Sequence, residues 1–169
     1  MRLTNGDRDA IVRRVLEVVM EPRKKALAKT GAKLGAAVLA AALGKHKRAY
    51  FALPEQFQHI DDDVKVIVQG LRIYLPLGKR QPTTESWINV SGELATQVES
   101  YMAEKSAIER DESTLRQQAR SVVMAATTAK QLTELWPAGS KYYGPLISET
   151  KQLPVSVRAL EEKISACAA

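Results

Sequence analysis

The feature that most constrains this chain is an apolar pattern with helical spacing between Gly92 and Trp136. One position of every heptad is apolar, namely Leu94, Tyr101, Ile108, Leu115, Val122, Ala129 and Trp136. The other seam position is interrupted by Lys105, Glu112 and Thr133. Because neither proline nor glycine occurs between Glu93 and Trp136, the pattern predicts one uninterrupted helix of roughly 65 Å. A helix of that length must lie along a partner, because it is longer than a small domain is wide.

A second helical pattern begins near the start of the chain. Thr4 or Asn5 can cap it, and Pro22 is expected to kink or restart it before it continues to about Ala49. Gly31 and Gly35 are four residues apart, which would let another helix approach closely; the alternative is a locally frayed segment.

Short alternating segments between the two helical patterns predict a small sheet. Residues 64–68 and 71–75 alternate in polarity around a Gln69-Gly70 turn, and residues 87–90 are a candidate third strand. We read residues 61–63, three aspartates, as a polar turn that precedes the first strand rather than as a cation site.

The predicted fold class is α+β, mainly α. It consists of two long antiparallel helices joined by a small β-meander, with a short C-terminal helix from about Ser156 to Ile164. The expected domain spans residues 1–136. Residues 137–169 form a tail whose short helix packs on the same domain.

Positive charge is concentrated in the first third of the chain. Residues 1–50 hold twelve Lys and Arg against four acidic residues, whereas residues 51–169 hold thirteen against fifteen. The candidate nucleic-acid-binding residues are Arg13, Arg14, Arg23, Lys24, Lys25, Lys29, Lys33, Lys45, Lys47 and Arg48. Such a field attracts phosphate polymers or an acidic protein surface.

Three of these lysines recur every four residues. Lys25, Lys29 and Lys33 therefore share one helical face that could follow a phosphate backbone. Because no aromatic residues are interleaved with them, the predicted contact is electrostatic and non-specific. The alternative is a solvated face, or one whose charges pair with Glu109, Asp111 and Glu112 of the second helix.

No motif in the sequence indicates catalysis. The chain has no phosphate-binding loop and no nucleophile elbow, and His46 and His59 lack partners at metal-ligand spacing, so we expect neither a metal nor a cofactor. The longest apolar run has ten residues, fewer than the roughly 20 that span a bilayer. With a single cysteine, Cys167, the expectation is a soluble cytoplasmic protein without a membrane partner.

A protein interface is the alternative to a nucleic-acid interface. The candidate residues come from the helical seam and the aromatic tail, and are Leu94, Tyr101, Ile108, Leu115, Tyr142 and Tyr143. The partner would be a host or virion protein, or a second copy of the chain in a homo-oligomer.

Several short motifs resemble a known family. They are Met1-Arg2-Leu3-Thr4-Asn5 followed by residues 8–12, then Leu132-Thr133-Glu134-Leu135-Trp136-Pro137, and finally Leu153-Pro154-Val155 before a short helix. They resemble small phage-encoded proteins of the nucleotide-modification-associated domain family, type five, over most of the chain. The resemblance implies an association with phage DNA modification and supplies no catalytic residues.

These observations lead to three hypotheses. The first is a non-catalytic phage accessory protein that docks through its basic helix on nucleic acid or on a nucleic-acid-handling complex. The second is a protein–protein interaction module that inhibits a host protein or serves in assembly. The third is an enzyme acting on nucleotides, for which the sequence shows no pocket-forming or metal-ligand set.

Overall fold

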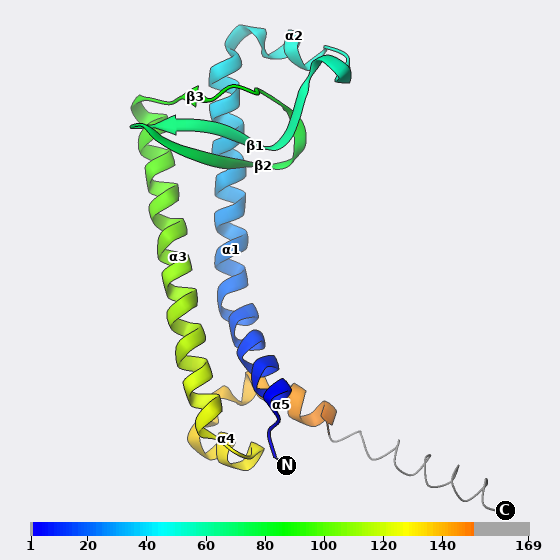
Figure 1. Ribbon diagram of the computed structural model, residues 1–169, viewed down its shortest axis with the longest axis vertical. Coiled ribbons are helices and arrows are strands. Elements are labelled where there is room, and N and C mark those ends of the chain that lie inside the picture. Colours follow the sequence, from blue (N-terminus) through cyan, green and yellow to red (C-terminus); the bar gives the residue numbers. More distant parts are fainter. Residues whose placement is uncertain (1, 151–169) are drawn as a thin grey trace, which may run out of the picture. The chain divides into compact units, whose positions relative to one another are not determined.

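The structure is a computed structural model and describes residues 2–150 (Figure 1). Contacts divide the chain into two units, each with a core of its own. The first unit combines Met1–Glu21 with Asp111–Ala169, and the second is the continuous stretch Pro22–Arg110. The expected boundary at residue 136 falls inside the first unit, and the predicted helix 156–164 lies outside the described residues.

The mainly helical α+β class is confirmed. In chain order the elements are α1 (Asn5–Leu43), η1 (Gly44–His46), α2 (Lys47–Phe51), η2 (Glu55–Phe57), β1 (His59–Val68), β2 (Leu71–Thr83), β3 (Ile88–Asn89), α3 (Gly92–Ala125), α4 (Ala129–Leu135), η3 (Pro137–Gly139) and α5 (Ser140–Thr150). Helix α1 continues through Pro22, so the predicted restart there is not found. It ends six residues before Ala49, where Gly44 adopts a positive φ of 51°.

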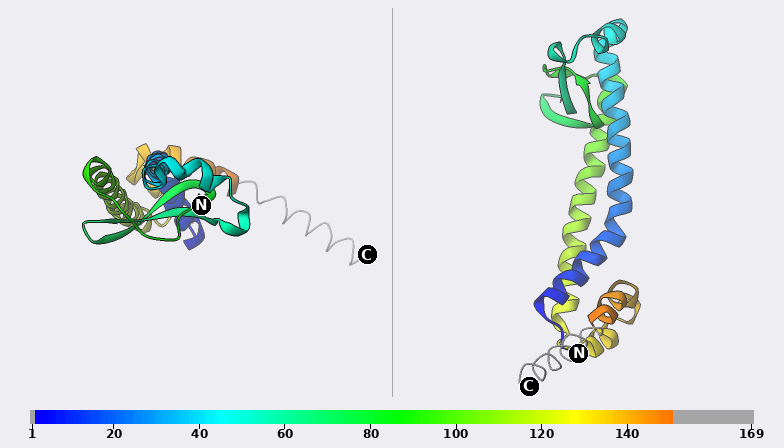
Figure 2. Two further views of the ribbon diagram at one scale, coloured as in Figure 1. Left: turned by 90° about the horizontal axis from the view of Figure 1, so that it is seen from above. Right: turned by 90° about the vertical axis from the view of Figure 1, so that its right-hand side faces the viewer.

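In the second unit, the C-terminal half of α1 and the N-terminal half of α3 run antiparallel and side by side (Figures 1 and 2). The small sheet lies across them. Alternation explains this packing, because every second side chain is buried over residues 64–68 of β1 and 73–77 of β2. The buried apolar residues of this unit are Leu27, Leu34, Val38, Leu39, Val64, Val66, Val68, Ile73, Leu75, Leu77, Val98, Tyr101 and Ile108.

The sheet is not a meander, and the prediction was wrong on this point. Strands β1 and β2 form the expected hairpin, whose turn residues Gln69 and Gly70 both have positive φ. However, the strand order is β2-β1-β3, and β3 pairs with β1 in parallel, with Ile88 opposite Val66. The physical reason is that β2 extends to Thr83, well beyond Pro76, so the chain returns along the free edge of β1. The three aspartates 61–63 lie within β1 and are not a turn before it.

The glycines at 31 and 35 do permit a close approach, by strand β2 at both positions and by the Tyr101 side chain of helix α3 at Gly31. A methyl group on Gly31 would lie 2.8 Å from Pro76 Cγ and 2.8 Å from the Tyr101 ring. A methyl group on Gly35 would collide with the Pro76 carbonyl oxygen. Strand β2 therefore crosses α1 at a distance that only glycine allows.

In the first unit, the predicted uninterrupted helix is broken. Helix α3 ends at Ala125, and Thr128 begins α4 with a capping box in which the Thr128 hydroxyl accepts from the Gln131 N–H. The break receives the start of the chain. The Leu3 N–H donates to the Thr127 carbonyl at 3.0 Å, and the Arg8 guanidinium donates to the Ala126 carbonyl at 3.0 Å. These contacts satisfy backbone groups that would otherwise lack partners where the helix ends.

The core of the first unit gathers residues from both ends of the chain. It contains Leu3, Ile11, Val123, Ala126, Leu132 and Tyr143. Trp136 packs against this cluster and stacks on Tyr142 with ring centroids 5.7 Å apart, while the Tyr143 hydroxyl donates to the Trp136 carbonyl at 2.9 Å. The apolar heptad pattern persists past Ala125 because its last two positions, Ala129 and Trp136, also pack against this core.

Candidate nucleic-acid interface

Much of the positive charge lies in one segment of the second unit. From Pro22 to Pro54 the sequence contains eight Lys and Arg and no Asp or Glu. These eight residues are Arg23, Lys24, Lys25, Lys29, Lys33, Lys45, Lys47 and Arg48. Helix α1 carries the first five of them, η1 carries Lys45, and α2 carries Lys47 and Arg48.

The three lysines predicted to share a face are all exposed on α1. Lys25, Lys29 and Lys33 form no ion pair with any residue between 2 and 150. Within the second unit, Glu109 of α3 therefore does not neutralise them, and Glu112 pairs with Arg116 at 3.0 Å. Three positive charges at four-residue spacing remain available to an anionic partner.

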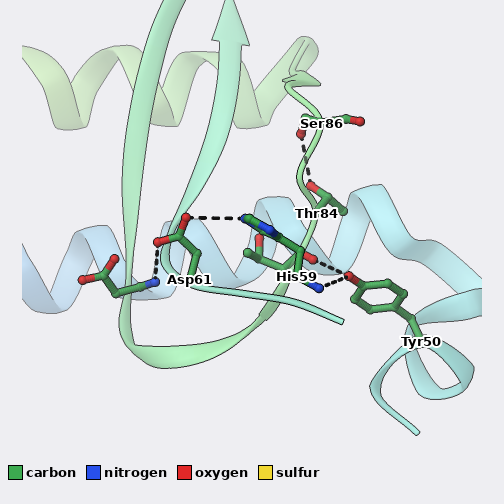
Figure 3. A network of polar contacts seen from close by, with 7 residues as sticks. Tyr50, His59, Asp61, Thr84 and Ser86 are labelled. Atoms are coloured by element: carbon green, nitrogen blue, oxygen red, sulfur yellow. Dashed lines mark hydrogen bonds and ion pairs between the residues drawn. The ribbon is translucent and has the colours of Figure 1, made fainter. Parts of the chain in front are cut away.

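A second basic group follows at the end of α1. Lys45, Lys47 and Arg48 lie in η1 and α2, and the Lys47 ammonium lies over the Phe51 ring at 5.8 Å. Tyr50 ties this segment to the sheet (Figure 3), because its hydroxyl donates to the Thr83 carbonyl at 2.5 Å and accepts from the His59 N–H at 3.3 Å. The anchor holds the second basic group in place without using any of its charges.

Most of the remaining predicted basic residues interact with other side chains of the protein or lie in the other unit. Arg23 and Lys24 interact with other residues of the chain. Arg13 and Arg14 belong to the first unit, where Arg14 pairs with Glu17 at 3.6 Å. The candidate residues that remain are Lys25, Lys29 and Lys33, with Lys45, Lys47 and Arg48 beyond them along the chain.

A groove of about 550 Å³ lies between α1 and α3 beside this basic face. Lys33 and Thr30 line it from α1, and Gln97, Ser100, Tyr101 and Glu104 line it from α3. Lys33 and Glu104 face the same groove without forming an ion pair. Its open shape and mixed polar lining give it none of the enclosure of a typical active-site pocket.

The residues predicted for a protein interface lie largely in the chain's own cores. Tyr101, Ile108 and Tyr143 are buried, with only 7% of Tyr101 exposed, and Leu94, Leu115 and Tyr142 are half-buried. Tyr142 in addition lies between the Trp136 ring and the Lys141 ammonium. Packing within the chain thus accounts for most of the surface of these six residues.

Two of the three aspartates on β1 have pKa values that are shifted in opposite directions. Backbone and side-chain hydrogen bonds at Asp62 lower the pKa of Asp61, which also lies 3.6 Å from His59 Nε2 (Figure 3). Burial, followed by the charges of Asp62 and Asp61, raises the pKa of Asp63, and only Lys105 opposes that shift. Between residues 2 and 150, no three His, Cys, Asp or Glu side chains are grouped to hold a metal ion.

The raised pKa of Asp63 makes stability depend on pH. When the folded pKa lies above the unfolded value, the unfolded chain releases its proton first, so stability falls as pH rises from about 3.8 through the folded pKa. We therefore expect D63N to raise the urea midpoint at neutral pH and to leave it unchanged near pH 3. An unchanged midpoint at both pH values would show that Lys105 already compensates the burial of Asp63.

A comparison with known protein families identifies the family of this chain. The family model described as "Nucleotide modification associated domain 5" matches residues 2–166. The chain belongs to this family. The resemblance found in the sequence motifs is thus confirmed over nearly the whole chain, and the family's description associates it with nucleotide modification. No curated protein and no solved structure matches it.

One property of this family member bears on its surroundings. By length and composition, the helical stretch Asn5–Phe51 could cross a membrane, because a window of 18 residues within it has a mean hydropathy of 1.4. This window is longer than the ten-residue apolar run Leu34–Leu43, because up to two charged residues are allowed within it. Inside the protein 33% of the window is buried, and core helices of soluble proteins meet the same criterion.

Sequence reasoning missed one cluster of polar and aromatic side chains in the second unit. Arg72, Tyr74 and Trp87 meet on the outer face of the sheet. Alternation along residues 71–75 could have placed Arg72 and Tyr74 on the face opposite Ile73 and Leu75. Nothing in the spacing could have brought Trp87 to them, because that contact depends on β3 pairing with β1.

Proposed function

We propose that this family member docks on nucleic acid, or on a complex that handles it, through the basic face of α1, and that it has no catalytic role of its own. The observation that supports this function most strongly is the combination of exposure and missing partners at Lys25, Lys29 and Lys33. Phosphate contacts of Lys residues release counterions from the nucleic acid and supply affinity without sequence preference. The family's association with nucleotide modification fits such a role in phage-infected cytoplasm.

The triple variant K25E/K29E/K33E tests this function. We expect duplex DNA binding, measured by fluorescence anisotropy at low salt, to weaken at least tenfold, and the salt slope to fall by about 3 because about one counterion is lost per lysine. The matched control is R120E/K130E/K141E, which makes the same change in net charge with exposed residues of the first unit. Equal losses in both variants would show that net charge alone, and not this face, governs binding.

A protein-interaction module is the second candidate function. It is favoured by exposed apolar side chains of the first unit, where Val18, Val19, Met124 and Leu135 are all accessible. Sedimentation of the purified chain gives a first test. A concentration-dependent oligomer that V19E dissociates would support this function, and a monomer at all concentrations would count against a homo-oligomer.

A further inference from the structure

The outer face of the sheet in the second unit carries paired aromatic rings between two cations. Lys65 lies opposite Tyr74 and Ile67 lies opposite Arg72 in the β1–β2 ladder, and directly opposed residues share a face. Asn89 lies opposite Ile67 on the other side. The inner face is formed by the buried residues Val64, Val66, Ile73 and Leu75, so this outer face is the one turned away from the core.

The aromatic rings on this face are held in a fixed arrangement. Tyr74 and Trp87 meet edge to face with centroids 5.3 Å apart, although Tyr74 lies in β2 and Trp87 directly precedes β3, on the other side of β1. The Arg72 guanidinium lies 5.3 Å from the Trp87 ring centroid. The Tyr74 side chain nevertheless stays 56% exposed, and its hydroxyl makes no hydrogen bond with residues 2–150. The ring is therefore accessible to a planar group that could stack on it, with a lysine and an arginine beside it.

We propose that this face binds single-stranded nucleic acid, with an unpaired base stacked on Tyr74 and the flanking phosphates held by Lys65 and Arg72. Base stacking on aromatic side chains within a positively charged surface is the general way in which proteins hold single strands. Asn89 offers an amide to the edge of a base. A duplex cannot use the ring, because its bases are already stacked within the helix.

The charges around the face agree with an anionic strand. The nearest carboxylate along β1 is Asp63, two residues before Lys65, and it is attracted to Lys105 of α3. At the hairpin end, Glu99 accepts a hydrogen bond from the Gln69 amide at 2.5 Å. Both carboxylates thus have partners of their own, while Lys65 and Arg72 have no carboxylate within ion-pair distance among the described residues.

This inference rests on the proposed function, because the basic face of α1 would attract the strand from a distance. Binding of four probes of equal length distinguishes the single-strand site on the sheet from the basic face. They are oligothymidylate, oligouridylate, an abasic phosphodiester strand and a DNA duplex. We expect oligothymidylate to bind about tenfold more tightly than the abasic strand, and Y74A to abolish that difference while leaving abasic and duplex binding unchanged. Y74F keeps the ring and should bind as the wild type does. If oligouridylate binds more tightly than oligothymidylate and Y74A abolishes that binding advantage over the abasic strand, the single-strand site on the sheet is supported and its ligand is RNA.

Tryptophan fluorescence distinguishes a variant that has lost the binding site from one that is misfolded. Only two tryptophans are present, Trp87 and Trp136. Oligothymidylate should quench emission in the wild type, and W87F, with an unchanged circular dichroism spectrum, should lose that quenching. Equal binding of oligothymidylate and the abasic strand would contradict the single-strand site at Tyr74 without contradicting the proposed function. Loss of duplex binding only in K25E/K29E/K33E, with the Tyr74 effect intact, would support both.

Discussion

Replacing Gly35 by alanine should destabilise the second unit strongly, although alanine is the better helix former. Within a helix the exchange alone would stabilise by up to about 1 kcal/mol. At Gly35, however, the added methyl group collides with the Pro76 carbonyl, a backbone atom of β2 that cannot rotate away. Forced overpacking of this kind costs about 1 to 3 kcal/mol, and more when backbone must move. The expected net loss in the free energy of unfolding is about 2 kcal/mol, measured by urea denaturation.

Gly6 supplies the matched control for Gly35. It also lies in α1, and a methyl group there would meet only the Thr4 hydroxyl at an ordinary 3.7 Å. G6A should therefore leave stability unchanged or raise it slightly. If G35A were as stable as G6A, β2 would not cross α1 at the distance described, and the position of the sheet on the helices would need revision.

Leu132 is the residue whose truncation should most weaken the first unit. Its side chain is 0% exposed, between Leu3, Val123 and Tyr143 in the core cluster. L132A removes buried methyl groups and leaves a cavity, for which the usual cost is about 2 to 5 kcal/mol. We expect a large drop in the urea midpoint and loss of the near-ultraviolet dichroism of Trp136 and Tyr143.

The control for L132A lies three residues further along the same helix. Leu135 is 55% exposed, so L135A makes the identical chemical change at a position with little to lose. Its stability should stay within about 0.5 kcal/mol of the wild type. A comparable loss in L135A would mean that the helix turns a different side to the core.

The sequence predicted which segments are helical, since the apolar period of α1 and α3 is a local property. It did not predict the break at Ala126–Thr128, because Ala-Ala-Thr-Thr contains no residue that ends a helix by itself. The break depends on Leu3 and Arg8, more than a hundred residues away, which bond to the carbonyls of Thr127 and Ala126. Long-range pairing also determines the position of β3 in the sheet. The alternation of its residues is equally compatible with pairing to β1 or to β2.

For the candidate site, the basic residues themselves were predictable and their environment was not. The spacing of Lys25, Lys29 and Lys33 fixes a common face, whereas the position of the carboxylates of α3 depends on how the helices rotate against one another. No aromatic residue is interleaved with the three lysines along α1. Tyr74 and Trp87 join the cations of the sheet through strand pairing, which no local pattern encodes.

The discontinuous first unit has a consequence for how the protein is made. Leu3, Arg8 and Ile11 leave the ribosome more than a hundred residues before their partners Ala126, Thr127 and Leu132. Residues 22–110, in contrast, form a contiguous stretch whose contacts can all be made as soon as Arg110 has emerged. Nascent chains should therefore acquire the sheet-bearing unit first, while Leu3, Arg8 and Ile11 remain accessible to proteases and chaperones until residues 126–143 have emerged.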